Sequence, residues 1–123
     1  MPRLTCPCGE SIDLSPIPNP LGFKLLAEPV LEEVLEALGE AASSAASPAV
    51  FDRAAHSLFF RRERPLPHAY ECPGCGRVAV FARASDDVPA AWYCPEPAEG
   101  SADPPVRLAA LAGTLPGGGG GAP

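Results

Sequence analysis

The stretch YECPGCG, residues 70–76, decides the fold, because it carries two cysteines at the spacing of a metal-binding turn. A stretch of the same kind, CPCGE at residues 6–10, lies near the start of the chain. In each, proline after the first cysteine presets the turn, and glycine after the last cysteine tolerates the positive φ that such a turn needs. Structural zinc takes four soft ligands in a tetrahedron, and each turn supplies two of them. The sequence therefore predicts one structural Zn²⁺ bound by Cys6, Cys8, Cys72 and Cys75.

The cysteine count and the absence of targeting signals favour a metal over disulfides. The chain has five cysteines, and an odd number argues against a simple disulfide framework. No apolar signal region precedes Cys6, and no run is long enough to cross a bilayer, so we expect a cytoplasmic protein in a reducing compartment. Cys94 is the fifth cysteine. We interpret it as a small apolar residue of the last strand, with an exchangeable ligand or a sensing thiol as the alternative.

The two cysteine turns, residues 6–10 and 70–76, are called the first and second knuckle below. The segment between them predicts a helical insertion at about residues 28–60. Pro29 stands where the first turn of a helix accepts proline, and apolar residues follow at three- and four-residue spacing. Ser47 before Pro48 is a second helix start, with a hydroxyl as its cap. Short strands are expected around the knuckles, at residues 3–5, 22–27, 68–71, 78–81 and 90–94. The expected fold class is α+β, a zinc-ribbon-like small antiparallel sheet with a two-helix insertion. We expect the helices to pack on that sheet through Val34, Leu38, Phe51 and Leu58.

Composition divides the chain into a folded part and a tail. The chain has 17 Pro and 12 Gly, and residues 97–123 combine a Pro-Pro pair with a run of glycines. Such a composition buries too little apolar surface to fold, so we expect residues 97–123 to be a disordered tail. The remaining residues 1–96 form one zinc-ribbon domain, small enough to need a staple beyond its own core.

Three quoted motifs together carry a resemblance. The CPCGE of residues 6–10, the YECPGCGRVAVF of residues 70–81 and the closing WYCPE of residues 92–96 resemble a group of small, uncharacterised bacterial zinc-ribbon proteins. Those proteins have an N-terminal Cys-x-Cys-Gly, a helical middle and a C-terminal Cys-Pro-x-Cys-Gly hairpin. The resemblance implies the fold and the metal, and it implies no activity. Cys94 departs from that pattern.

Catalytic groups are not evident in the sequence. Four thiolates on one Zn²⁺ leave no open position for an activated water, and no nucleophile triad, phosphate loop or carboxylate pair is present. A redox or metal-handling protein that uses Cys72, Cys75 and Cys94 is one alternative. In thioredoxin-like redox proteins, however, the Cys-x-x-Cys motif opens a helix, whereas a β pattern follows Gly76 here. We therefore expect a protein that is not an enzyme.

Charge distribution leaves the partner open. The net charge is −6, which disfavours non-specific nucleic-acid binding. Residues 10–40 contain seven acids and one base, whereas residues 53–83 contain six arginines and two acids. These segments either pair within the fold or serve partners. We expect a protein-binding module of adaptor or immunity type. The alternative is a nucleic-acid-associated zinc ribbon that uses the arginines of residues 53–83: Arg53, Arg61, Arg62, Arg64, Arg77 and Arg83.

Overall fold

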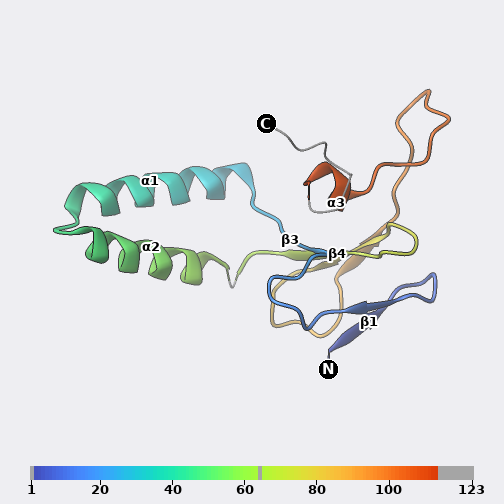
Figure 1. Ribbon diagram of the computed structural model, residues 1–123, viewed down its shortest axis with the longest axis horizontal. Coiled ribbons are helices and arrows are strands. Elements are labelled where there is room, and N and C mark those ends of the chain that lie inside the picture. The colour runs from blue at the N-terminus through green and yellow to red at the C-terminus, as the bar shows by residue number, and fades with distance from the viewer. Residues whose placement is uncertain (1, 64, 114–123) are drawn as a thin grey trace.

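The computed structural model describes residues 2–63 and 65–113, and within these ranges the chain has an α+β fold (Figure 1). The strands are β1 (Arg3–Thr5), β2 (Ser11–Asp13), β3 (Gly22–Lys24), β4 (His68–Glu71), β5 (Val78–Phe81) and β6 (Ala91–Tyr93). The helices are α1 (Glu28–Ser44), α2 (Pro48–Glu63) and α3 (Leu108–Leu111). Two small antiparallel sheets, with α1 and α2 inserted between the knuckles, confirm the predicted zinc-ribbon-like fold class.

The two sheets each contain one cysteine knuckle. Strands β1 and β2 pair antiparallel around the first knuckle, and the second sheet has the order β3-β4-β5-β6 with the second knuckle between β4 and β5. Strand β2 was not predicted, because the three residues between Glu10 and Leu14 are too few to show a repeating pattern. That short strand nevertheless makes the first knuckle a closed hairpin.

The core of the ribbon is built around the cysteines themselves. Cys6, Ile12 and Cys72 form one buried cluster, and their exposed fractions are 2%, 0% and 0%. Partly buried apolar side chains from both sheets pack against this cluster, namely Leu4, Leu14, Leu21, Tyr70 and Trp92. Since so few apolar residues are buried, we expect the stability of the fold to depend on an additional link between the two knuckles.

The helices begin where the sequence indicated. Pro29 lies in the first turn of α1, and the Ser47 hydroxyl accepts a hydrogen bond of 3.2 Å from the Val50 N–H at the start of α2. Helix α1 continues through Gly39 into the Ala/Ser stretch as far as Ser44, because no proline interrupts it there.

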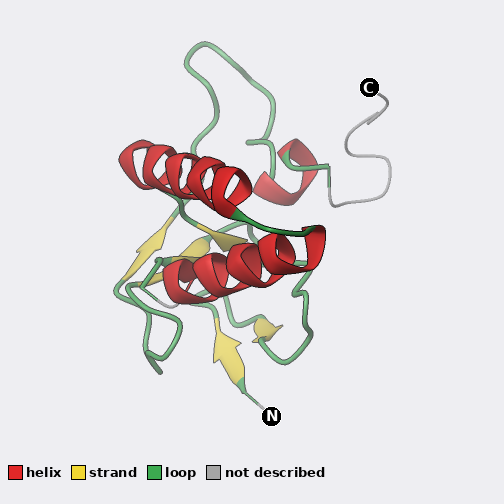
Figure 2. Ribbon diagram, turned by 90° about the vertical axis from the view of Figure 1, so that its left-hand side faces the viewer, coloured by secondary structure: helices red, strands yellow, loops and turns green. Residues whose placement is uncertain are grey.

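The packing of the helices corrects one expectation. Helices α1 and α2 contact each other as an antiparallel hairpin, and no comparable contact joins either of them to a strand within the described residues. The hairpin projects from the sheets (Figure 1), and its two helices lie side by side in a view turned by 90° (Figure 2). Val34 and Leu58 are buried, and we attribute this to packing between the helices. Prolines at 65 and 67 separate α2 from β4, so the apolar stripes meet each other before they reach the sheet.

The segment after residue 96 also differs from expectation. Helix α3 forms at Leu108–Leu111, and Ala109 within it is 1% exposed. Residues 107–111 thus form a short helical segment within the predicted tail, and polar contacts described below join this segment to the second knuckle. Residues 114–123 of the predicted tail lie outside the described part of the chain.

Candidate metal centre

The four cysteines predicted as ligands lie together at one point between the sheets. Their Sγ atoms are all within 4.8 Å of one another, although the two knuckles are far apart in the sequence. The Sγ atoms of Cys6 and Cys75 are 3.5 Å apart, and those of Cys8 and Cys72 are 3.6 Å apart. Four sulfurs bound tetrahedrally at about 2.3 Å from an ion would be about 3.8 Å apart. The cluster can therefore hold a metal ion.

Each knuckle is closed by a matching set of backbone hydrogen bonds. The Cys6 N–H donates to the Glu10 carbonyl, and the Gly9 N–H donates to the Cys6 carbonyl, both at 2.8 Å. In the second knuckle, the Cys72 N–H donates to the Arg77 carbonyl at 2.8 Å, and the Gly76 N–H donates to the Cys72 carbonyl at 3.0 Å. Gly9 and Gly76 have φ values of +97° and +81°, a backbone conformation in which a residue with a side chain would be strained. These hydrogen bonds and glycines hold the two cysteines of each knuckle so that both sulfurs lie on one side of the turn.

Backbone N–H groups point at the sulfurs of the second knuckle. The Gly74 N–H donates to the Cys72 sulfur at 3.4 Å, and the Arg77 N–H donates to the Cys75 sulfur at 3.4 Å. The latter bond lowers the pKa of Cys75 to about 6, whereas burial raises the pKa of Cys6 to about 12. The two shifts are opposite because the Arg77 N–H favours the thiolate form of Cys75, whereas burial disfavours the thiolate form of Cys6.

An arginine accompanies the cluster. The Arg77 guanidinium donates to the Cys75 sulfur at 3.5 Å, and this contact raises the pKa of Arg77. A positive charge beside four thiolates offsets part of the negative charge that a metal-thiolate centre retains.

The arrangement of the thiols bears on the redox alternative. The short sulfur-sulfur distances given above each join one knuckle to the other, as ligands of a shared ion are placed. The second knuckle is followed by strand β5 and not by a helix, so the helix N-terminus that activates a redox dithiol is missing. Cys94, the fifth cysteine, is exposed after β6 and lies outside the four-sulfur cluster.

Two residues of the centre were missed by sequence analysis. Glu71 precedes Cys72 and is 2% exposed, although it is charged. Its carboxylate accepts hydrogen bonds from the N–H groups of Leu108 at 2.7 Å and Ala109 at 3.1 Å. Arg107 donates to three carbonyl oxygens of the second knuckle, those of Cys72, Pro73 and Gly74. The sequence feature that could have indicated Arg107 is its position as the one charged residue in the apolar segment VRLAAL, residues 106–111.

The described arginines of the proposed nucleic-acid surface lie in different parts of the fold. Arg53 and Arg61 are exposed on α2, while Arg62 pairs with Glu33 of α1 at 3.2 Å. Arg77 contacts the cysteine cluster, Arg83 lies between β5 and β6, and Arg64 is outside the described residues. The arginine-rich segment is therefore divided among different parts of the fold.

Comparisons with known proteins give one match. A family described as a domain of unknown function, DUF8617, matches residues 2–97. No curated protein and no solved structure matches the chain. Among the described residues, no helix combines the length and the apolar character needed to span a membrane. The matched residues 2–97 make up more than half of the chain and include both knuckles and the helical hairpin, and this protein therefore belongs to the DUF8617 family.

Proposed function

We propose that this protein is a zinc-stabilised, non-enzymatic protein-binding module, in which the hairpin of α1 and α2 makes contact with the partner. The observation that carries the proposal is that the hairpin projects from the ribbon (Figure 1), while several of its large apolar side chains are exposed to solvent. Leu35 is 53% exposed and Phe59 is 51% exposed, on two helices whose main contacts with other elements of the described chain are with each other. Exposed apolar side chains grouped on one element are typical of a protein contact surface.

Zinc is the metal that we assign to the centre. Four cysteine thiolates are the ligand set of structural Zn²⁺, and a closed tetrahedron leaves no position for an activated water. Cys6, Cys8, Cys72 and Cys75 would hold the ion, which would tie the first sheet to the second. Such an ion is structural, and because it leaves no open coordination position we propose no enzymatic activity.

Charge on α1 specifies the kind of partner. Glu32, Glu36 and Glu40 are exposed and make no ion pair with a described residue, whereas Glu33 pairs with Arg62 across the hairpin. Successive residues of a helix are turned by about 100°, so the Glu32 and Glu36 side chains border those of Leu31 and Leu35. An acidic strip beside an apolar one complements a partner segment that carries both basic and apolar side chains.

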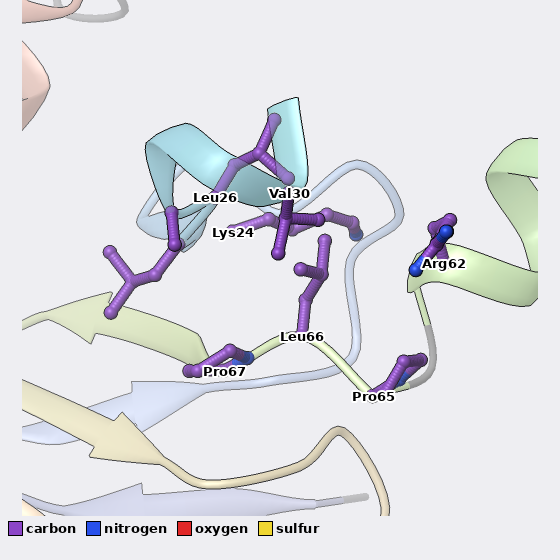
Figure 3. A pocket seen from close by; sticks show the side chains of 9 residues that line it. Lys24, Leu26, Val30, Arg62, Pro65, Leu66 and Pro67 are labelled. Carbon is purple, nitrogen blue, oxygen red and sulfur yellow. The ribbon is translucent and has the colours of Figure 1, made fainter. Parts of the chain in front are cut away.

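A groove at the base of the hairpin extends the apolar surface. It has a volume of about 590 Å³ and lies between the segment that enters α1 and the segment that leaves α2. Figure 3 shows Leu66 pointing toward Val30 across this groove, with Leu26 beside them and Arg62 at one end. Such a groove can take an apolar side chain of the partner segment while the acidic strip binds its basic residues.

Charge reversal on α1 tests the proposal. Replacing Glu32, Glu36 and Glu40 by lysine is expected to abolish capture of the partner, because the acidic strip becomes repulsive, while zinc content and melting temperature stay unchanged. Leu31→Ala with Leu35→Ala should weaken capture as well. The measurement is affinity capture with cross-linking, followed by mass spectrometry and by titration of the identified partner.

The matched control reverses the same number of charges elsewhere. Glu96, Glu99 and Asp103 are exposed and lie outside the hairpin, so their replacement by lysine should leave capture intact. The proposal is wrong if the α1 reversal retains full binding. It is also wrong if the wild-type protein binds DNA or RNA tightly and in a salt-sensitive manner, which would favour the arginines instead.

A further inference from the structure

We propose that Arg107 is a positioning residue of the metal centre, which prolongs retention of the ion by polarising the peptide unit that donates to the Cys72 sulfur. This inference rests on the proposed zinc site and goes beyond it, since it assigns a role to a residue after the family match, which ends at residue 97. Arg107 lies at the start of α3, in a segment that composition alone predicts to be disordered.

The first step is the contact between Arg107 and the second knuckle. One guanidinium nitrogen donates to the Cys72 carbonyl oxygen at 2.9 Å and to the Pro73 carbonyl oxygen at 2.7 Å. The other terminal nitrogen donates to the Gly74 carbonyl oxygen at 3.0 Å. Three successive carbonyl groups therefore converge on one cation, which is a geometry that the planar guanidinium with its several donors can satisfy.

The second step connects these carbonyls to the sulfur. The Pro73 carbonyl and the Gly74 N–H belong to the same peptide unit, and that N–H donates to the Cys72 sulfur at 3.4 Å. A cation at the oxygen end draws electron density away from the N–H end, and hydrogen bonds in such a chain strengthen one another. Arg107 thereby strengthens a hydrogen bond to the sulfur without contacting the sulfur itself. Partners of this kind tune the affinity of a metal site.

The third step is the anchor that keeps Arg107 in place. The buried Glu71 carboxylate accepts from the Leu108 and Ala109 N–H groups, immediately after Arg107 in the chain. Burying a carboxylate is costly unless it is hydrogen-bonded, so these two donors and the buried carboxylate stabilise each other. Since Glu71 also precedes Cys72, one strand end holds both the ligand and the segment that carries Arg107.

The charge of the centre explains why a second arginine is useful. Four thiolates around Zn²⁺ leave an excess of negative charge, of which Arg77 offsets a part by direct contact with the Cys75 sulfur. Arg107 supplies positive charge on the side of Cys72. Each sulfur of the second knuckle thus has its own arginine, one acting directly and one through a peptide.

Zinc release from the full-length protein tests this inference. The zinc-loaded wild type, Arg107→Ala, Arg107→Lys and the control Arg53→Ala are each mixed with excess 4-(2-pyridylazo)resorcinol, and release is followed by absorbance. Arg53 is exposed on α2 and makes no side-chain hydrogen bond or ion pair with a described residue. The expected release is about 10- to 100-fold faster for Arg107→Ala, intermediate for Arg107→Lys and unchanged for Arg53→Ala.

A spectroscopic measurement separates polarisation from a merely structural effect. In the Co²⁺-substituted protein, weakening the hydrogen bond to sulfur should move the thiolate-to-cobalt charge-transfer band of Arg107→Ala to longer wavelength. Release within about twofold of the wild type, with the band unmoved, would overturn the inference. If Arg107→Ala takes up no metal, Arg107→Lys against the wild type decides between these results. A wild-type protein that binds no zinc would instead overturn the proposed function.

Discussion

Replacing Cys72 by serine is expected to remove the zinc and to unfold the ribbon. The Cys72 side chain is 0% exposed and belongs to the central buried cluster, so its loss removes a ligand and a core contact together. Structural zinc contributes on the order of 10 kcal/mol to the folding of small domains, which is comparable to the whole stability of a typical domain. Metal analysis of the purified variant and its far-ultraviolet circular dichroism measure the two effects.

The fifth cysteine supplies the matched control for this experiment. Cys94 is exposed and lies outside the four-sulfur cluster, so Cys94→Ser should retain about one zinc per chain and the melting temperature of the wild type. Equal loss of zinc from Cys94→Ser and Cys72→Ser would mean that the ligand set is wrong. Retention of zinc by Cys72→Ser would mean the same.

Ile12→Ala is expected to have the second largest effect, a loss of about 2 to 5 kcal/mol in the free energy of unfolding. Ile12 is 0% exposed and belongs to the same buried cluster as Cys6 and Cys72, so truncation leaves a cavity in the cluster that contains two ligands of the proposed site. Urea unfolding in the presence of excess zinc measures the loss, because the metal then stays bound to the folded state.

Val88→Ala is the control for the cavity. Val88 is also β-branched, but it is 73% exposed, so its truncation should change the free energy of unfolding by less than about 0.5 kcal/mol. A cost at Ile12 no larger than the cost at Val88 would contradict the assignment of the core to the cysteine cluster.

The sequence predicted those parts of the fold that local chemistry determines. The positive-φ glycines of the knuckles, Pro29 in the first turn of α1 and the Ser47 cap of α2 each act on their own neighbours, and these features were identified correctly. The four cysteines could be grouped because their spacing is itself the geometry of a turn. The convergence of their sulfurs agrees with that grouping.

Other features could not be predicted because they depend on contacts between distant residues. Apolar stripes on α1 and α2 indicate that each helix packs on something, and they do not indicate whether that is a sheet or the other helix. Arg107 and Glu71 lie 36 positions apart, by subtraction of their numbers, and only the folded chain brings the Leu108 N–H to the carboxylate. The composition of that segment predicts disorder. In the structure, five hydrogen bonds join the segment to the second knuckle and to the end of β4, and composition gives no sign of such contacts.

X-ray absorption at the zinc edge of the purified full-length protein tests the central claim most directly. If Cys6, Cys8, Cys72 and Cys75 hold one structural Zn²⁺, the first coordination shell will contain four sulfurs at about 2.3 Å and no nitrogen or oxygen. A shell with fewer than four sulfurs, or with an oxygen or nitrogen at about 2.0 Å, would contradict the closed four-cysteine centre on which this account rests.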